Sequence, residues 1–373
     1  MKKMLFISHE KDRNGSTNSM ITLIKELIKN YDYEIEVLLP FWGPAAKTLK
    51  QNGISYKIFY YFDNKRVVNK KKILRESVKE VVNCLAVERL IQYLKRVKYD
   101  YIISNSSAVD IGVRAALKIN VRHVYYVREF MEEDFSFEYR NKKRMKKMLE
   151  FSNKVIFVSN AVANKYVKLY KLENYKVIYN AINPENYLIE NHKILERKEL
   201  RFIQVGMLSE GKGTKSSIEF IEKLRRTVKC HLTLAGSGSE IYIQKLYEYI
   251  EKNQLKENIS IIPYTNDIKA LFKEEDIILI NSKCEGFGRV TVEGMLGGLL
   301  AVGKSTGGTK EIITKGETGV LFEDSDDFLC AMHKVYNNRL IYKRIAERGQ
   351  MYAIKNFSPE KNAKAVEAYL REN

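Results

Sequence analysis

The feature that most constrains this chain is the alternation of short apolar runs with longer amphipathic stretches. In the first half, runs of strand length occur at Met4–Ile7, Glu34–Leu39, Tyr56–Phe59, Tyr101–Ser104, His123–Val127, Lys154–Val158 and Lys176–Tyr179. Stretches with helical periodicity, such as Ser19–Ile28 and Ile73–Lys95, lie between them. Strands that alternate with helices predict a parallel sheet with helices on both faces.

The pattern begins again in the second half. Further apolar runs occur at Leu200–Val205, His231–Ala235, Ile259–Ile262, Ile277–Ile280, Leu299–Val302 and Val320–Phe322. The turn-rich segment Asn180–Glu185 and the polar stretch Glu190–Glu199 separate the halves. The 373 residues suit two domains, which we place at 1–180 and 181–355. A last helix at about 356–373, with Pro359 at its first position, belongs with the first domain.

The net charge of +18 suggests an anionic partner, such as nucleic acid, lipid headgroups or a phosphorylated substrate. A coding bias toward Lys, Asn, Ile and Tyr is the alternative. The run Lys142–Lys147 has a helical pattern, and it lacks interleaved aromatic residues and any known nucleic-acid module. We therefore expect no nucleic-acid partner. The run is interpreted as a solvated helix face or as a contact with an anionic membrane surface.

The cysteines and histidines form no metal-binding or redox motif. The four Cys include no Cys-x-x-Cys pair, and the five His are scattered. Asp324-Ser-Asp326 resembles a metal-binding Asp-x-Asp, but its place between a strand and a helix favours helix capping. No apolar run approaches the roughly 18 residues of a membrane span. We expect a cytoplasmic protein, soluble or peripheral on the cytoplasmic face of the membrane, without metal or cofactor.

Glycine-bearing loops follow four strands of the second half, namely Gly206–Gly213, Gly236–Ser239, Asn281–Gly288 and Gly303–Thr309. In open α/β sheets, ligands bind at the carboxyl ends of the strands. Glycine lets backbone N–H groups approach oxygens closely, and helix amino ends favour anions. The loops therefore predict a nucleotide or phosphate site.

Two carboxylates, Glu285 and Glu293, are separated by seven residues in Glu285-Gly-Phe-Gly-Arg-Val-Thr-Val-Glu293. If a helix begins near Gly288, Glu285 lies in the loop above it and Glu293 lies more than one turn along it. One carboxylate could then face a sugar and the other a ribose. The alternative is that Glu285 caps the helix and Glu293 lies on its surface.

This stretch resembles the Glu-x7-Glu motif of retaining GT-B glycosyltransferases, the group 1 or family-four class. Other matching elements occur in the order of that family: Asn14–Ser16, Gly206–Gly213, Gly307-Gly308 with Glu311, Thr318–Phe322, and Phe357-Ser358-Pro359. The resemblance covers nearly the whole chain. It implies an α/β fold with two Rossmann-like domains facing across a cleft, and a carboxyl-terminal helix that crosses back to the first domain. The first domain would be the acceptor side, and the second would bind the nucleotide-sugar.

The resemblance also implies roles for single residues. Lys212 would bind the donor diphosphate, Glu285 would hold the donor sugar, and Glu293 would bind the ribose hydroxyls. Lys212, Glu285 and Arg128 are the candidate catalytic residues. The remaining candidates for donor binding are Gly15, Ser16, Gly206, Gly286, Phe287, Gly288, Arg289, Val290 and Thr291.

Two positions depart from the family pattern. Met207 stands where members usually carry an arginine that pairs with the lysine, so one phosphate partner is missing. Arg128-Glu129 stands where many members carry His-Asp. We expect Arg128 to face the cleft and replace the missing cation. The alternative is a surface arginine at a strand end.

The resemblance predicts a retaining, metal-independent transfer of a sugar from a nucleotide-sugar, with a UDP-sugar favoured. The acceptor would be a glycan or a lipid-linked molecule, in cell-surface polysaccharide or glycoconjugate synthesis. Two alternatives remain, a nucleotide-sugar epimerase and a non-catalytic subunit that stabilises a partner enzyme. A nicotinamide-dependent oxidoreductase is disfavoured because the segment Ser8–Gly15 lacks the Gly-x-Gly-x-x-Gly phosphate turn.

Overall fold

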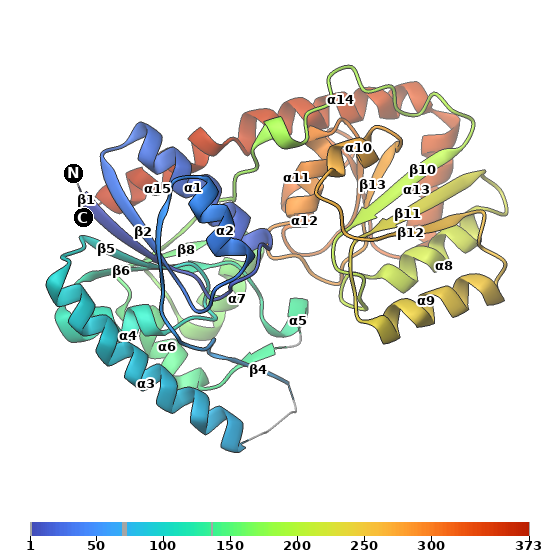
Figure 1. The fold of residues 1–373 in the computed structure, drawn as a ribbon. Coiled ribbons are helices and arrows are strands. Elements are labelled where there is room, and N and C mark those ends of the chain that lie inside the picture. The colour runs from blue at the N-terminus through green and yellow to red at the C-terminus, as the bar shows by residue number, and fades with distance from the viewer. Residues whose placement is uncertain (1, 69–72, 136, 373) are drawn as a thin grey trace. The chain divides into compact units, whose positions relative to one another are not determined.

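The computed structural model describes residues 2–68, 73–135 and 137–372. Contacts divide the chain into two compact units (Figure 1). Unit 1 comprises Met1–Ala181 together with Pro359–Asn373, and unit 2 comprises Ile182–Ser358. Each unit is built around its own parallel sheet, so the α/β class with two Rossmann-like units is confirmed.

The sheet of unit 1 has seven parallel strands in the order β3-β2-β1-β5-β6-β8-β9. The interior strand β1 pairs with β2 on one side and with β5 on the other, and it is fully buried from Met4 to Ile7. This double burial explains its unbroken apolar run. The strand bounds are β1 Lys2–Ile7, β2 Tyr33–Leu39, β3 Ser55–Ile58, β5 Tyr101–Ser104, β6 Arg122–Val127, β8 Lys154–Phe157 and β9 Tyr175–Val177.

Helices cover both faces of this sheet. Helices α3, α4 and α6 lie on one face, and α1 and α15 pack together on the other (Figure 1). The described helices of unit 1 are α1 Gly15–Asn30, α2 Pro44–Gln51, α3 Ile73–Arg96, α4 Ile111–Ile119, α5 Glu132–Phe135, α6 Lys142–Phe151, α7 Asn160–Tyr170 and α15 Pro359–Arg371.

Unit 1 also contains a two-stranded antiparallel sheet that was not predicted from the sequence. It pairs β4 (Lys65–Val67) with β7 (Phe137–Tyr139). Each strand has three residues, which is too short to show an alternating pattern. The pairing joins segments about seventy residues apart, so no local sequence pattern predicts it.

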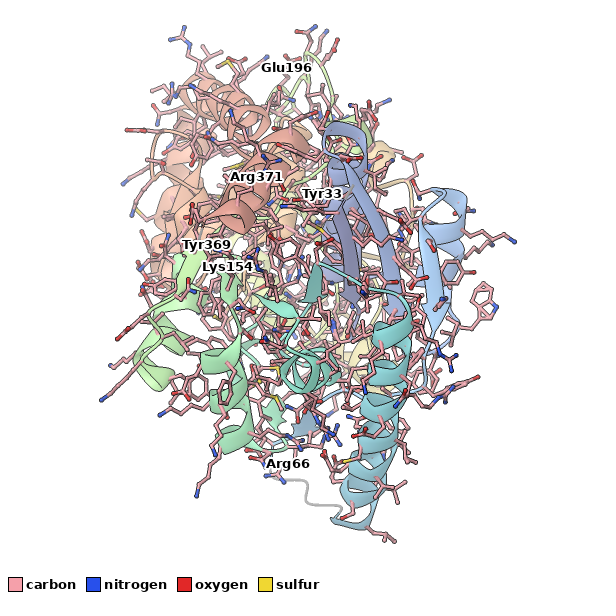
Figure 2. All side chains as sticks on the ribbon, turned by 90° about the vertical axis from the view of Figure 1, so that its left-hand side faces the viewer. Tyr33, Arg66, Lys154, Glu196, Tyr369 and Arg371 are labelled. Carbon is pink, nitrogen blue, oxygen red and sulfur yellow. The ribbon has the colours of Figure 1, made fainter. Side chains whose placement is uncertain are left out.

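The carboxyl-terminal helix α15 is part of unit 1, as the family pattern implied. The Tyr33 hydroxyl donates to Glu367, and the Tyr101 hydroxyl donates to the carbonyl of Leu370 at 3.1 Å. The Lys154 ammonium lies 4.5 Å from the centre of the Tyr369 ring. Figure 2 shows Tyr369 near Lys154, and Arg371 near Tyr33. The end of the chain is therefore fixed to the first sheet by buried polar contacts as well as by packing.

The sheet of unit 2 has six parallel strands in the order β12-β11-β10-β13-β14-β15. Its strands are β10 Leu200–Val205, β11 Cys230–Ala235, β12 Ile259–Ile262, β13 Ile277–Ile280, β14 Leu300–Lys304 and β15 Val320–Phe322. Its helices are the 3₁₀ turn η1 Pro184–Asn186, α8 Thr214–Leu224, α9 Glu240–Lys252, α10 Ile268–Phe272, α11 Arg289–Leu296, α12 Thr309–Ile312, α13 Ser325–Asn337 and α14 Arg339–Asn356.

One loop boundary in unit 2 differs from the prediction. Gly303 was expected to open the loop after a strand ending at Val302, but it lies inside β14 and pairs with Leu321. A side chain at Gly303 would meet the Thr309 methyl group at 2.5 Å. The glycine therefore lets α12 pack closely over the strand, which is a tertiary reason that the local sequence does not show.

In the described residues, every helix is too short or too polar to cross a bilayer.

Candidate functional site

Loops from neighbouring strands of unit 2 converge at the carboxyl edge of its sheet. A side chain at Gly213, after β10, would lie 2.0 Å from the carbonyl oxygen of Asn281, after β13. Likewise, a side chain at Gly307, after β14, would lie 2.4 Å from the carbonyl oxygen of Glu285. Only glycine permits such close contact of backbones. The glycine-bearing loops are thus locked to one another around the segment 281–288.

Lys212 and Glu285 meet at this edge. The Lys212 Nζ atom lies 2.7 Å from Glu285 Oε1, and the Ser282 hydroxyl donates to the same oxygen at 2.6 Å. Both side chains are partly exposed, at 26% and 17%. The Gln204 amide holds the carbonyl of Lys212 at 2.7 Å, so the backbone beneath the lysine is fixed. The arrangement presents a cation and a carboxylate side by side to a ligand.

The predicted donor loop 286–288 leads directly into α11. Gly288 is the N-cap of the helix with φ of +95°, and Arg289 and Val290 occupy its first two positions. The Thr291 amide donates to the Gly288 carbonyl at 3.0 Å. Phe287 is buried and its ring packs edge-on against Phe357, with centroids 5.6 Å apart. The loop can therefore offer backbone groups, and not the aromatic ring, to a ligand.

Two threonine hydroxyls near the amino end of α11 have no hydrogen-bond partner among the described residues. They belong to Thr291 and to Thr309, at the start of α12. Both lie close to Gly288, since a side chain there would approach Thr291 Oγ1 at 3.3 Å and Thr309 Oγ1 at 3.5 Å. A helix amino end with hydroxyl groups nearby suits an anion.

Glu293 lies further along α11, as the seven-residue spacing predicted. It is buried, and its Oε1 atom accepts from Arg289 NH2 at 3.0 Å. Burial and the Glu293 carboxylate raise the pKa of Tyr187 above its ordinary range. Tyr187 follows η1, and the sequence analysis did not identify it. The structure thus places a carboxylate, a guanidinium and a phenol together beside the helix.

At the first positions of the β10 loop, Gly206 adopts φ of +128° and Met207 is 57% exposed. An exposed thioether supplies no charge to a phosphate. The missing cation noted in the sequence is therefore not replaced at this position.

In unit 1, Gly15 and Ser16 lie at the amino end of α1. The expected glycine loop is shorter than predicted, because Gly15 is already the first residue of the helix and Asn14 is its N-cap. The Ser16 hydroxyl donates to Asn14 at 2.8 Å. The Asn105 amide, after β5, donates to the Ser16 carbonyl at 3.4 Å. Asn105 thus connects this helix start to the ends of β5 and β6.

Arg128, after β6, is buried within unit 1 and is not a surface residue. Its Nε and NH2 atoms donate to Asn105 Oδ1 at 3.1 and 2.8 Å, and NH1 donates to Asn180 Oδ1. The guanidinium lies 4.0 Å from the centre of the Tyr126 ring. Asn105 and Asn180 were missed in the sequence. The only signal available was that each closely follows a strand.

The neighbouring Glu129 is also buried, and it accepts from Ser106 and Ser107. The Ser107 amide donates to Oε1 at 2.9 Å and the Ser106 hydroxyl donates to it at 2.8 Å. The Arg128-Glu129 pair is therefore anchored to the loop after β5 by separate sets of hydrogen bonds. This fixes the carboxyl edge of the first sheet.

Among the described residues, no group of three or more His, Cys, Asp or Glu side chains has a metal-binding arrangement. Asp324 is the N-cap of α13 and accepts from the amides of Asp326 and Asp327, both at 3.0 Å. Helix capping therefore accounts for the Asp-x-Asp sequence, as predicted.

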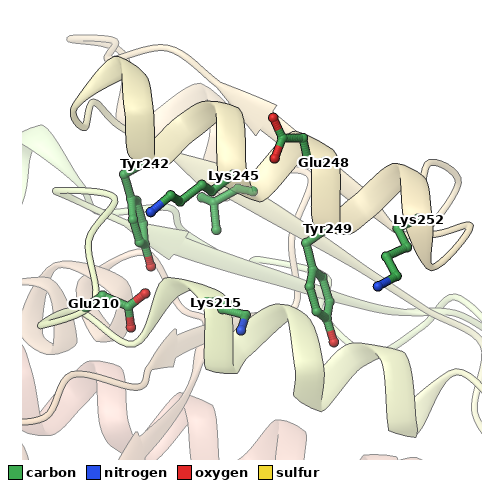
Figure 3. Close-up of a pocket in the computed structure, with 8 residues that line it drawn as sticks. Glu210, Lys215, Tyr242, Lys245, Glu248, Tyr249 and Lys252 are labelled. Carbon is green, nitrogen blue, oxygen red and sulfur yellow. The ribbon is translucent and has the colours of Figure 1, made fainter.

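A separate groove of about 420 Å³ lies between α8 and α9 (Figure 3). Lys215 projects into it from α8, and its ammonium lies 5.3 Å from the centre of the Tyr249 ring. None of the predicted donor-binding residues lines this groove. The candidate site is therefore the loop edge, and the groove is a different feature.

Comparison with known families gives two matches that together span most of the chain. Residues 188–352 match "Glycosyl transferases group 1", and residues 13–186 match "Glycosyltransferase Family 4". An uncharacterized glycosyltransferase of Haemophilus influenzae is 21% identical over 305 residues, which cover 79% of this chain and 83% of the relative. The UDP-Gal:alpha-D-GlcNAc-diphosphoundecaprenol alpha-1,3-galactosyltransferase of Escherichia coli is 23% identical over 349 residues, covering 85% and 83%.

Solved structures show the same fold. HepE of Anabaena, in complex with UDP and glucose, superposes with a TM-score of 0.80 at 20% identity, covering 99% of each chain. The lipopolysaccharide outer core galactosyltransferase WaaB superposes with a TM-score of 0.71 at 16% identity, again over 99% of each chain. At these identities, the likeness establishes the GT-B fold.

Proposed function

Because the chain belongs to the group 1 glycosyltransferases, we propose that it transfers a sugar from a nucleotide-sugar, most simply a UDP-sugar, to a glycan or lipid-linked acceptor. We propose further that the transfer retains the anomeric configuration and needs no metal ion. The acceptor-side role falls to unit 1 and the donor-binding role to unit 2.

The observation that carries this proposal is the Lys212–Glu285 pair at the converging loops of unit 2, 2.7 Å apart. A departing nucleoside diphosphate gains negative charge as its bond to the sugar breaks. Lys212 supplies a positive charge at the loop edge, and the amino end of α11 adds backbone N–H groups. Preorganised donors of this kind do the electrostatic work that a metal ion does in other transferases.

Glu285 suits a binding role better than a nucleophilic one. Its Oε1 atom is already engaged by Lys212 and Ser282, and an engaged carboxylate is a poor nucleophile. In a front-face reaction, the bond from the sugar C1 to the phosphate oxygen breaks while the acceptor oxygen bonds to C1 on the same face. The leaving phosphate oxygen takes the acceptor proton, so no protein nucleophile or base is required. Positioning then supplies most of the rate.

The assignment of the remaining donor contacts follows the geometry of α11. The Gly286 and Gly288 backbone and the first amides of the helix, at Arg289, Val290 and Thr291, would hold the diphosphate and sugar. Glu293 would bind the ribose hydroxyls, with Arg289 keeping its carboxylate in place at 3.0 Å. The Thr291 hydroxyl, which has no partner within the described part of the chain, is a further donor for a phosphate oxygen.

The printed names of relatives support the substrate classes. The Escherichia coli relative is named for a UDP-Gal donor, a diphosphoundecaprenol-linked acceptor and an alpha linkage, and HepE was crystallised with UDP and glucose. These properties belong to those proteins. They make a UDP-sugar and a lipid-linked or glycan acceptor the first compounds to test with this chain.

A non-catalytic subunit is the second candidate, and Met207 is the observation that favours it. An exposed methionine at this loop removes one cation from the diphosphate site. Lys212, Glu285 and Glu293 are all present at the same edge, which argues for catalysis. The epimerase alternative has no comparable structural support.

Purified protein should be incubated with UDP-, GDP- and ADP-sugars in EDTA, with lipid extract as acceptor. We expect a stabilising thermal shift and release of nucleoside diphosphate with one donor class. Loss of all turnover in EDTA, restored by manganese, would refute metal independence. A thermal shift without turnover under any condition, until a partner protein is added, would support the non-catalytic alternative.

A further inference from the structure

Nearly all of the excess positive charge of this protein lies in one of its two units. Unit 1 carries 38 of the 64 Lys and Arg residues and 22 of the 46 Asp and Glu residues, a net charge of +16. Unit 2 carries the other 26 and 24, a net charge of +2. A general coding bias toward lysine would charge both units alike. The partition therefore points to an anionic partner of unit 1.

An apolar stripe runs along the outer side of α3 in this same unit. Leu74, Val78, Val81 and Leu85 are 80%, 55%, 61% and 61% exposed. Their spacing of four, three and four residues places them on one face of the helix, over a length of about 17 Å. The opposite face of α3 is buried in the core, through Val87, Leu90, Ile91 and Leu94. Helix α3 is thus apolar both on the side that packs against the core and on the side that is exposed.

Helix α6 adds positive charge on the same face of the sheet. Its residues Lys142, Lys143, Lys146 and Lys147 are exposed, while Met145, Met148 and Leu149 are buried. Helix α4 lies between α6 and α3 and contacts both. Arg144 of α6 forms a bidentate ion pair with Glu80 of α3, at 2.5 and 2.8 Å. The two helices therefore belong to one layer on this side of the sheet (Figure 1).

Along the stripe, α3 carries Arg75, Lys79 and Arg89 against Glu76, Glu80 and Glu88, and each of these acids has a cationic partner within 4.0 Å. Arg75 and Arg89 of α3 are exposed beside the stripe. The exposed acid Glu88 is paired with Lys118, as Lys142 is with Glu132 and Lys146 with Glu150. No acidic side chain of the described residues lies within ion-pair distance of Lys143 or Lys147. Those two lysines are therefore the best placed to meet an external anion.

We propose that this docking face, formed by the α3 stripe and the lysines of α6, binds the surface of an anionic lipid bilayer. The apolar side chains would enter the headgroup region while the lysines meet lipid phosphates, the pattern by which interfacial helices bind membranes. The inference deepens the proposed function by naming where unit 1 meets a lipid-linked acceptor. Vesicle binding itself is measured without any sugar transfer.

A second copy of the chain is a less suitable occupant. Symmetric pairing through this face would bring two units of +16 together, and would oppose lysine to lysine. An exposed apolar stripe with a basic margin is instead complementary to lipid headgroups. The experiment below therefore also examines whether the protein self-associates through this face.

The test is co-sedimentation of the full-length protein with vesicles of phosphatidylcholine, with and without half phosphatidylglycerol. We expect binding to the anionic vesicles that weakens in high salt, and little binding to pure phosphatidylcholine. The double variant Lys143→Gln/Lys147→Gln should bind about 30-fold more weakly, at about fivefold per lysine. Val81→Gln/Leu85→Gln should also reduce binding by about tenfold or more, because it removes the inserted apolar side chains.

Matched controls are available in the same chain. Lys25 and Lys29 of α1 are exposed, have the same four-residue spacing, and lie on the opposite face of the sheet. Lys25→Gln/Lys29→Gln should bind vesicles like the wild type. Leu340→Gln/Ile341→Gln, at an exposed apolar pair in unit 2, should do the same.

If the α1 and α6 lysine variants lose vesicle binding equally, the docking face is wrong, because binding then depends only on the net charge of the protein. Equal binding to neutral vesicles, or none to either kind, would overturn the proposal. So would a dimer in solution that Val81→Gln/Leu85→Gln dissociates. Circular dichroism and the melting temperature check that each variant is folded. Transfer to a water-soluble acceptor should be unchanged in the docking variants, so a failure here is distinguishable from a failure of the proposed function.

Discussion

At the scale of single residues, Lys212 carries the largest share of the proposed chemistry. It pairs with Glu285 at 2.7 Å, and a diphosphate would compete for the same ammonium. Lys212→Ala should lower kcat/KM by about 10² to 10³, as expected for the loss of one preorganised donor at a developing charge. Lys215→Ala is the control, because Lys215 projects into the α8–α9 groove instead (Figure 3). Steady-state kinetics of both variants test this. Equal kcat/KM values for Lys212→Ala and Lys215→Ala would contradict the role of Lys212.

Arg128 remains the candidate for the cation missing at Met207. Arg128→Ala should reduce transfer about tenfold or more, while binding of free UDP to unit 2, measured by calorimetry, should persist. Adding Met207→Arg to that variant should restore part of the activity. The structure adds that truncation also leaves the Asn105 and Asn180 side chains without their buried partner, so the melting temperature should fall. Full activity of Arg128→Ala would remove Arg128 from the mechanism.

Glu275 makes a separate prediction about stability. It is 3% exposed beside the Thr233 hydroxyl, and burial raises its pKa from 4.5 to about 7. A raised carboxyl pKa means that the folded state prefers the proton. Its contribution to stability is therefore full below pH 4.5 and is lost as the pH rises through about 7.

Glu275→Gln should therefore stabilise the protein at pH 8 by about 1–2 kcal/mol, and by less at pH 5.5. Urea unfolding at the two pH values measures this. The exposed neighbour Glu274 gives the control Glu274→Gln, which should leave the pH dependence unchanged. An unchanged profile in Glu275→Gln would show that this carboxylate ionises normally in the folded state.

At the scale of elements, close glycine contacts hold the loops of the site together. Gly307 has φ of +51° and touches the backbone of Glu285, and the Gly308 amide donates to the Glu285 carbonyl at 2.8 Å. Gly307→Ala should displace Glu285 and lower both kcat and stability, the latter by about 1–3 kcal/mol. Gly316→Ala is the control, since Gly316 has φ of +80° but open space around it. If both variants behave alike, backbone strain alone explains the effect and the contact is unimportant.

Elements with a strong local pattern were the ones predicted from the sequence. The run Leu200–Val205 and the start of α11 after Gly288 are where the sequence placed them, because apolar runs and glycine turns are local signals. The pairing of β4 with β7 was missed because it depends on distant segments. The environment of Arg128 was missed for the same reason, since Asn105 and Asn180 come from other strand ends.

At the scale of the whole molecule, the two units differ in charge although they share one architecture. Unit 2 is nearly neutral and contains the Lys212–Glu285 loop edge. There, individual side chains and not the net charge of the unit would bind the donor. Unit 1 is strongly basic and contains the docking face on α3 and α6. The division suits a transferase that takes its donor from solution and its acceptor from a charged surface. Donor turnover should accordingly depend less on salt than vesicle binding does.

The most direct measurement is the anomeric configuration of the product, made from a UDP-α-sugar in the presence of EDTA. The coupling of the anomeric proton in the NMR spectrum distinguishes an α from a β linkage. We predict an α-linked product, formed at an undiminished rate without divalent metal, and formed hundreds of times more slowly by Lys212→Ala. A β-linked product, or a product formed only after manganese is added back, would contradict this prediction.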